Sequence, residues 1–205
     1  MAVAAASSTN VLWFITRGTG VVSLVLLTIV MALGVANVRR LRTASIPRFV
    51  LDAVHRNAAL LAVSFVAVHV ITTLLDPYVS INPLAAVVPF ASAYKPLWIG
   101  LGAVSLDLLF AVMITSLLRR RLGHRVWRAT HWLAYGSWPV ALFHSLGAGT
   151  DASSRWMLAL AAGCTLTVLG AVAVRMSGTY EADEPALSTP QPPRAPRVSP
   201  SWSSR

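Results

Sequence analysis

A run without any charged side chain extends over residues 18–38, and four further apolar stretches follow it along the chain. About 20 apolar residues is the length that an α-helix needs to cross a bilayer. Charged residues make up 12% of the 205 residues, about half the share found in soluble domains. Alternating strands of the kind that form membrane barrels are absent from the sequence. We therefore predict an all-α membrane protein.

The apolar stretches predict a bundle of five transmembrane helices, over about residues 11–38, 49–75, 96–118, 126–148 and 156–174. We expect residues 1–10 to form a short outer N-terminus and residues 11–175 a single membrane domain. Residues 176–205 are rich in Pro, Ser and Ala, and we expect a disordered cytoplasmic tail. No Lys or Arg precedes the first apolar run, so we expect a retained helix and not a cleaved signal.

The arginines predict the orientation of the bundle. They cluster in the first and third connections, whereas the second and fourth are nearly free of positive charge; the clustered residues are Arg39, Arg40, Arg42, Arg48, Arg119, Arg120, Arg121, Arg125 and Arg128. The positive-inside rule then places the N-terminus outside and the C-terminus in the cytoplasm. The same clustering explains the net charge of +10 without a nucleic-acid partner. We expect a multi-pass protein of the plasma (inner) membrane, surrounded by lipid.

Four histidines form two pairs within predicted helices, His55/His69 at positions i and i+14 and His131/His144 at positions i and i+13. Each pair spans about 20 Å of helix at a rise of about 1.5 Å per residue. Ionisable side chains are costly in hydrocarbon, so they indicate function. Both helices run from inside to outside, which puts His55 and His131 at one depth near the cytoplasm. His69 and His144 share a second depth near the outer face.

Matched depths favour haem over a closed zinc site, whose four ligands would have to converge on one point. Two imidazoles from facing helices can hold haem iron from its two sides. The C-x-x-C-H motif of covalent haem is absent, and Cys164 is the single cysteine, so we predict two non-covalent haem b groups. The i, i+13 spacing does not return to the same helix face, and we expect Pro139 to kink or rewind that helix. The alternative is that the histidines only form hydrogen bonds in the packing.

Four segments carry a resemblance to known proteins: Trp13-x-x-x-Arg17-x-Thr19-Gly20, His55-Arg56-Asn57 with His69 following, Thr115-Ser116-Leu117-Leu118-Arg119-Arg120, and His131 with His144. Over about residues 13–175 the chain resembles the ferric reductase-like transmembrane family. That family includes the membrane parts of ferric reductases and NADPH oxidases, and the haem subunit of bacterial methionine sulfoxide reductase systems. The resemblance implies an inner haem on His55 and His131 and an outer haem on His69 and His144. Electrons would pass from inside to outside.

Many members of that family continue into FAD- and NADPH-binding domains. Here about thirty residues follow the fifth predicted helix, without a glycine-rich dinucleotide fingerprint. We therefore expect the electron donor to be a separate flavoprotein reductase or a membrane quinol, so that flavin or quinone comes through a partner. The acceptor would be an extracytoplasmic protein or metal chelate. The chain would be an oxidoreductase, or the electron-transfer subunit of one.

Two further residues are candidate cofactor contacts. Arg17 could neutralise a propionate of the outer haem, or extend to the interface. Trp138, two helical turns after His131, would lie between the haems, where its ring could mediate electron tunnelling; core packing is the alternative. Asp107, at the centre of the third span, could carry a proton or form a structural hydrogen bond. His124 is expected to be a surface residue.

Two glycine pairs, Gly18/Gly20 and Gly100/Gly102, could admit close packing of helices or haem. Two other functions fit the same residues. One is a non-redox helical membrane protein, such as a proton path or a scaffold, that uses the histidines and Asp107 without haem. The other is a quinone-linked cytochrome b of a different fold.

Overall fold

Six α-helices and one 3₁₀ turn make up the computed structural model over the residues that it describes, 2–38, 47–77, 79 and 81–177. The elements are α1 (Ala2–Val38), α2 (Arg48–Leu75), η1 (Pro83–Ala86), α3 (Pro96–Leu117), α4 (Arg119–His131), α5 (Leu133–Ala148) and α6 (Arg155–Ser177). No strand occurs in these ranges, which confirms the all-α class. Arg39, Arg40 and Arg42, and the predicted tail beyond Ser177, lie outside the described residues.

Local sequence sets several helix boundaries. α2 follows Pro47, and α3 begins with Pro96, because proline has no N–H to lose in the first turn of a helix. Lys95 precedes α3 in the left-handed conformation, with φ of 40°. Within α4 the chain kinks at Gly123, where φ is 78° and ψ is 159°. Glycine adopts that conformation at little cost, so it allows the arginine-rich segment to turn.

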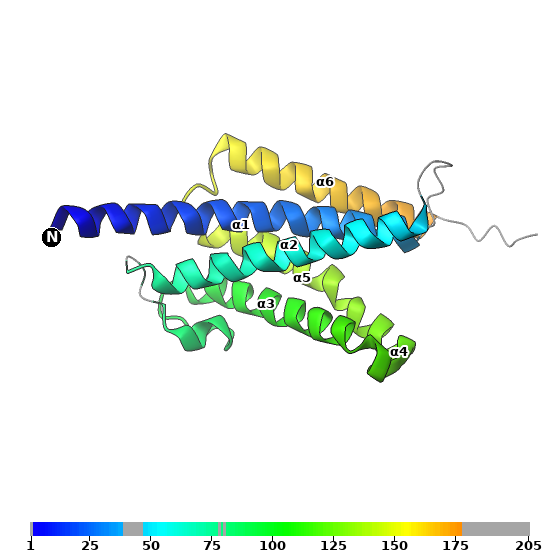
Figure 1. Ribbon diagram of the computed structural model, residues 1–205. Helices are drawn as coiled ribbons and strands as arrows, with labels where there is room; N and C mark the ends of the chain where they lie inside the picture. The colour runs from blue at the N-terminus through cyan, green and yellow to red at the C-terminus, as the bar shows by residue number, and fades with distance from the viewer. Residues whose placement is uncertain (1, 39–46, 78, 80, 178–205) are drawn as a thin grey trace, which may run out of the picture.

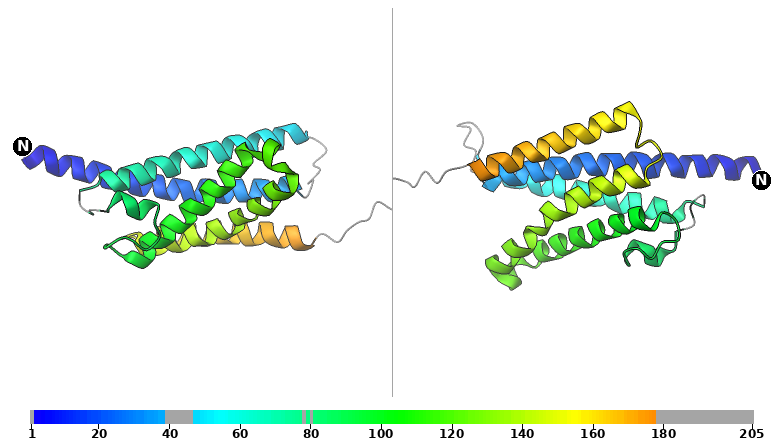
Figure 2. Two further views of the ribbon diagram at one scale, coloured as in Figure 1. Left: turned by 90° about the horizontal axis from the view of Figure 1, so that it is seen from below. Right: turned by 180° about the vertical axis from the view of Figure 1, so that it is seen from behind.

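Five helices lie along one long axis and alternate in direction, while α4 caps one end of the bundle (Figure 1). α1 and α2 pack against each other along their length, and α3 and α5 form a second pair. α6 lies against α1 on the side away from α3, and the two views in Figure 2 agree with this order. As a result α2 and α5 run in the same direction, so residues that come early in each lie at the same end.

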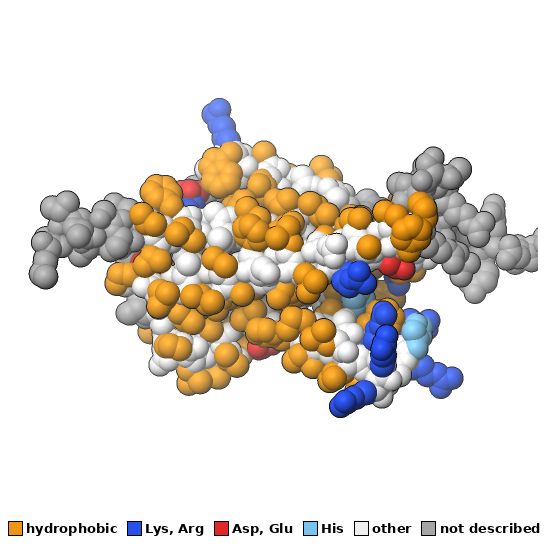
Figure 3. Space-filling view, in the orientation of Figure 1, with side chains coloured by type: hydrophobic (Ala, Val, Ile, Leu, Met, Phe, Trp, Pro, Cys, Tyr) orange, Lys and Arg blue, Asp and Glu red, His pale blue; other side chains and the backbone are white. Residues whose placement is uncertain are grey.

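The surface of this bundle is apolar. Four helical segments are long and apolar enough to cross a membrane: Val11–Val38, Phe49–Leu75, Pro96–Leu117 and Arg155–Ser177, with mean hydropathies of 2.5, 2.3, 2.1 and 2.2. Large side chains such as Phe14, Leu60 and Leu166 are exposed on them, and hydrophobic atoms cover most of the face in Figure 3. A soluble monomer rarely exposes so much contiguous apolar surface. The chain is a multi-pass membrane protein.

The remaining predicted span, residues 126–148, is divided into α4 and α5 at Trp132. The N–H of Trp132 donates to Ala129 O at 3.3 Å, and the N–H of Tyr135 donates to Trp132 O at 3.0 Å. These i→i−3 bonds tighten the turn, and the tightening lies about two turns before the Pro139 at which a kink was expected. α5 alone has 16 residues, about 24 Å, which is shorter than a hydrocarbon core. Length and apolarity therefore identify four crossings among the described residues.

Candidate functional site

The structure brings the four histidines together as two facing pairs. The ring centroids of His55 and His131 lie 6.4 Å apart, and those of His69 and His144 lie 6.3 Å apart. A metal bound by one nitrogen of each ring, at about 2.0–2.1 Å, would place the two centroids about 6.2 Å apart, because each centroid lies about 1.1 Å behind its nitrogen. Both pairs therefore have a centroid separation at which two imidazoles would be able to bind one iron.

Three of the four imidazoles donate a hydrogen bond from Nδ1 to a backbone carbonyl of a neighbouring helix. The distances are 3.1 Å from His55 to Val30 O, 2.8 Å from His69 to Thr16 O and 2.7 Å from His144 to Trp98 O. A carbonyl only accepts, so Nδ1 carries the proton in each ring, and Nε2 of the neutral ring keeps its lone pair. A hydrogen bond from the other ring nitrogen in this way typically orients a histidine that binds a metal.

A glycine lies beside each of these three rings, one helical turn after the residue whose carbonyl accepts the bond. A Cβ on the glycine would stand 3.3 Å from Cε1 of His55 at Gly34, 3.0 Å from Cε1 of His69 at Gly20, and 2.6 Å from Cε1 of His144 at Gly102. The missing side chain therefore makes the room that lets each imidazole approach the carbonyl. We call this space beside each imidazole, which a Cβ on the glycine would fill, a glycine notch.

Sequence reasoning missed this role of the glycines, although a signal for it exists. The interval from Gly20 to Gly34 on α1 equals the interval from His55 to His69 on the antiparallel α2. Equal spacings on two antiparallel helices keep both contacts in register. Gly20 was expected only to admit close packing, and Gly34 was not singled out.

His131 differs from the other three histidines. Its Nδ1 is buried and has no hydrogen-bond partner within the described ranges. Its ring instead lies against Trp127, with centroids 5.1 Å apart and planes at 34°. The indole of Trp127 donates to Ser116 Oγ on α3 at 3.3 Å. The ring of His131 is thus held by an aromatic contact and not by a backbone acceptor.

A cavity of about 290 Å³ adjoins the His69–His144 pair, between α1, α2, α3 and α5. Its walls are mostly apolar, with residues such as Leu27, Val66 and Leu106. Thr16, whose carbonyl accepts the bond from His69, also lines this cavity, and its buried hydroxyl has no partner in the described part of the chain. An apolar cavity lined by two imidazoles has the chemistry that would suit a porphyrin.

Arg17 lies at the rim of the same cavity. Its guanidinium forms an ion pair with the carboxylate of Asp151, donates to the hydroxyl of Thr150, and stacks 4.5 Å above the ring of Trp13. Since Thr150 and Asp151 belong to the connection between α5 and α6, these contacts hold the loop against α1. Arg17 and its partner Asp151 therefore line the same cavity as His69 and His144 as an ion pair.

Trp138 lies in the hydrophobic core between α1, α5 and α6, a cluster with Leu24, Leu142, Ala161, Cys164 and Val168. It is 5% exposed, and its indole donates to Thr28 Oγ1 at 2.9 Å. It does not line the cavity described above, whereas its neighbours Ser137 and Ala141 do. These contacts agree with the packing alternative for Trp138.

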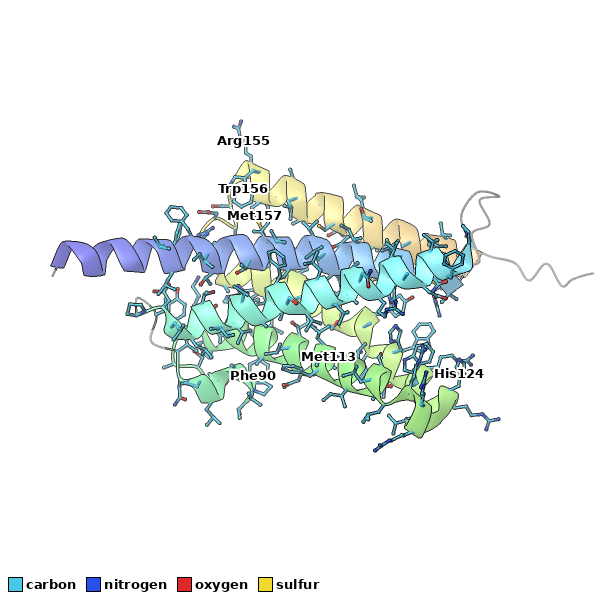
Figure 4. All side chains as sticks on the ribbon, in the orientation of Figure 1. Phe90, Met113, His124, Arg155, Trp156 and Met157 are labelled. Carbon is cyan, nitrogen blue, oxygen red and sulfur yellow. The ribbon has the colours of Figure 1, made fainter. Side chains whose placement is uncertain are left out.

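His124 is exposed on α4 at one end of the bundle, as expected for a surface residue, and Figure 4 marks its position. Asp107 is half-buried on α3. The described residues contain no group of three or more His, Cys, Asp or Glu side chains that could hold a bare metal ion. Two imidazoles per site suit an iron whose other four ligands come from a macrocycle.

Comparison with known families gives one match. A family model described as the ferric reductase like transmembrane component matches residues 19–142, which is more than half of the chain and includes His55, His69 and His131. No curated protein and no solved structure matches the chain. The chain therefore belongs to the family of ferric reductase-like transmembrane components, membrane electron-transfer proteins that generally bind haem.

Proposed function

We propose that this chain is a di-haem b-type electron-transfer protein and the membrane subunit of a reductase. It would carry electrons from a cytoplasmic or quinol donor to an extracytoplasmic acceptor. The observation that supports this most strongly is the pairing of imidazoles at 6.4 and 6.3 Å, with Nδ1 fixed to a carbonyl in three of four rings. The Nδ1 bonds leave Nε2 of those three rings unprotonated, which is the state in which a histidine can bind a metal.

His55 and His131, here the inner pair, would hold one haem, and His69 and His144, the outer pair, would hold the other. Haem supplies a one-electron carrier when bound. The chain contributes the rest of the mechanism. The carbonyls of Thr16, Val30 and Trp98 fix the orientation of three of the four rings, and the glycine beside each of those three rings gives it room. The apolar walls beside the outer pair would exclude water, and the ion pair of Arg17 with Asp151 lines the same cavity.

The bundle would cross the membrane five times, with residues 126–148, the end of α4 and all of α5, forming the fourth crossing and residues 11–175 forming the haem domain. Arg119, Arg120, Arg121, Arg125 and Arg128 all lie on α4, and basic side chains gather at that end of the molecule in Figure 3. His124 and Arg155 lie at opposite ends of the bundle (Figure 4). The positive-inside rule then favours a cytoplasmic α4 and C-terminus and an outer N-terminus in the plasma membrane.

Ferric reductase-like membrane domains typically work with separate reductase or flavin partners. For this chain the donor would be a flavoprotein reductase or a quinol that reaches the inner pair from the side of α4. The acceptor, a protein or a metal chelate, would receive electrons at the outer pair.

The test is a set of single ligand substitutions in the purified full chain. His55→Ala and His69→Ala should each lower the haem content from two per chain to one, as measured by the pyridine haemochrome assay. His124→Ala is the matched control, since that histidine is exposed and lies outside both pairs. Retention of both haems in His55→Ala and in His69→Ala would refute the assignment.

A further inference from the structure

The imidazole of His131 is oriented differently from the other three. Its Nδ1 is buried and has no hydrogen-bond partner among the described residues. Each of the other rings donates from Nδ1 to a backbone carbonyl, which limits how that ring can turn about its bond to Cβ. A contact of another kind therefore has to orient the ring of His131.

Trp127 makes such a contact. Residues 124–131 form the part of α4 that follows the kink at Gly123. Trp127 and His131 are four residues apart in this part, so their side chains leave the same face of the helix. Their ring centroids lie 5.1 Å apart, with the planes at 34°. The indole therefore covers one side of the imidazole and restricts its rotation.

Ser116 in turn holds the indole. The Nε1–H of Trp127 donates to Ser116 Oγ at 3.3 Å, and Ser116 lies in the last turn of α3. This bond ties the indole to a second helix, so the ring of Trp127 cannot swing away from His131 without breaking it. Ser116, Trp127 and His131 thus form a continuous series of contacts from α3 to the inner pair.

The backbone around His131 makes these side-chain contacts more important. The chain departs from helical angles at Gly123, where φ is 78°, and its hydrogen-bond pattern changes at Trp132. Residues 124–131 thus lie between two interruptions. The other three histidines lie within the helices α2 and α5. The position of His131 therefore depends more on what its own short segment touches.

We propose that Trp127 is the positioning residue of His131, in the place that a backbone carbonyl takes for the other three histidines, and that Ser116 positions Trp127. The inference rests on the two-haem function proposed above. Loss of the indole leaves the ring of His131 free to turn away from His55. His131 then becomes the one ligand of the four that a small molecule can displace from the inner haem.

The experiment uses the purified full chain with both haems. Trp127→Leu removes the ring contact and the N–H donor together. The low-spin EPR signal of one haem should change, and the reduced protein should bind carbon monoxide at about one haem per chain, because six-coordinate iron binds it only when a ligand leaves. That haem should also pass to apomyoglobin at least about tenfold faster, the lower end of the loss typical of a missing outer-shell partner. The outer haem is the internal reference.

Two milder substitutions separate the ring contact from the hydrogen bond. Trp127→Phe keeps an aromatic ring beside His131 but has no N–H, and Ser116→Ala removes the acceptor of the same bond. Each should give a smaller change than Trp127→Leu, in the same direction. Since both remove one interaction, the double variant should change no more than either single variant.

Two controls match these substitutions. Trp132→Leu removes an exposed indole that follows His131 directly in sequence but packs on Tyr135 and Arg175. Ser64→Ala removes a hydroxyl that donates only within α2, to Leu60 O. Neither should increase carbon monoxide binding or haem transfer.

The outcomes are distinct. Wild-type protein without haem would refute the proposed function itself, before any variant is compared. With haem present, unchanged spectra and carbon monoxide binding in Trp127→Leu would overturn the role of Trp127, and so would an equal change in Trp132→Leu. Equal loss of both haems in Trp127→Phe and Ser116→Ala would also overturn it, because these residues would then support the whole bundle and not one ligand.

Discussion

Gly102 on α3 lies directly against the ring of His144 on α5, so closely that a Cβ at residue 102 would stand 2.6 Å from Cε1 and 2.7 Å from Nδ1 of the imidazole. The backbone of α3 and the imidazole are thus fitted to each other at the His69–His144 pair. The same relationship occurs at Gly20 with His69 and at Gly34 with His55, at 3.0 and 3.3 Å. Three helix contacts therefore control how three of the four imidazoles are aimed.

Alanine at these three glycines should lower the haem content by amounts that follow the distances from the added Cβ to the imidazole. Gly102→Ala should displace His144 and remove most of the outer haem, because contacts under 3.0 Å force a shift. Gly20→Ala should have a smaller effect, and Gly34→Ala the smallest. Haem content and the absorbance spectrum measure the series. Gly163→Ala on α6, where nothing lies within 4 Å of a built Cβ, is the control. Equal haem loss at all three positions, or at none, contradicts the notch model.

Arg17 and Asp151 should shift the outer haem potential in opposite directions. Removal of the positive charge in Arg17→Gln disfavours the added electron and lowers the potential. Asp151→Asn removes a negative charge next to Arg17 and raises it. Redox measurements on the His55→Ala protein, which keeps the outer haem, test both. We expect little change in stability, because the pair is partly exposed and such pairs contribute about 0–1 kcal/mol. A shift of the same sign in both variants would contradict this placement of Arg17.

Trp138→Phe should lower the stability of the bundle and leave the haem content at two per chain. The substitution removes the indole donor to Thr28 Oγ1 and part of the α1–α5–α6 core. The expected loss is about 1–3 kcal/mol, typical of a buried hydrogen-bonding group that loses its partner. Thermal unfolding, followed by light scattering and by the absorbance of the haem band, measures this loss of stability. Unchanged stability with slower electron transfer between the haems would favour the tunnelling role instead.

The fourth crossing, over residues 126–148, can be tested by labelling introduced cysteines. In a Cys164→Ala background, His124→Cys should react with a membrane-impermeant maleimide only from the cytoplasmic side. Ser153→Cys, between α5 and α6, should react only from outside. Both positions are exposed in the structure, so lack of reaction reports the membrane side and not burial. Labelling of both cysteines from the same side would mean that residues 126–148 do not cross the membrane.

The helical class and the facing histidines could be predicted from sequence, because apolar length and the paired spacings depend on few physical constraints. The break at Trp132 could not, since its backbone angles of −64° and −23° are close to helical and only the hydrogen-bond pattern changes. Gly34 has no functional group, so its role becomes visible only when α1 and α2 are packed and Gly34 lies beside the ring of His55. The position of Trp138 depended on which helix packs beside α5, which no local pattern specifies.

The most direct test of the central claim is the haem-to-protein ratio of the purified, full-length chain, measured by pyridine haemochrome against quantitative amino-acid analysis. Two facing imidazole pairs predict two haem b per chain, with the spectrum of six-coordinate iron in both oxidation states. A ratio of zero in correctly folded protein would contradict the account.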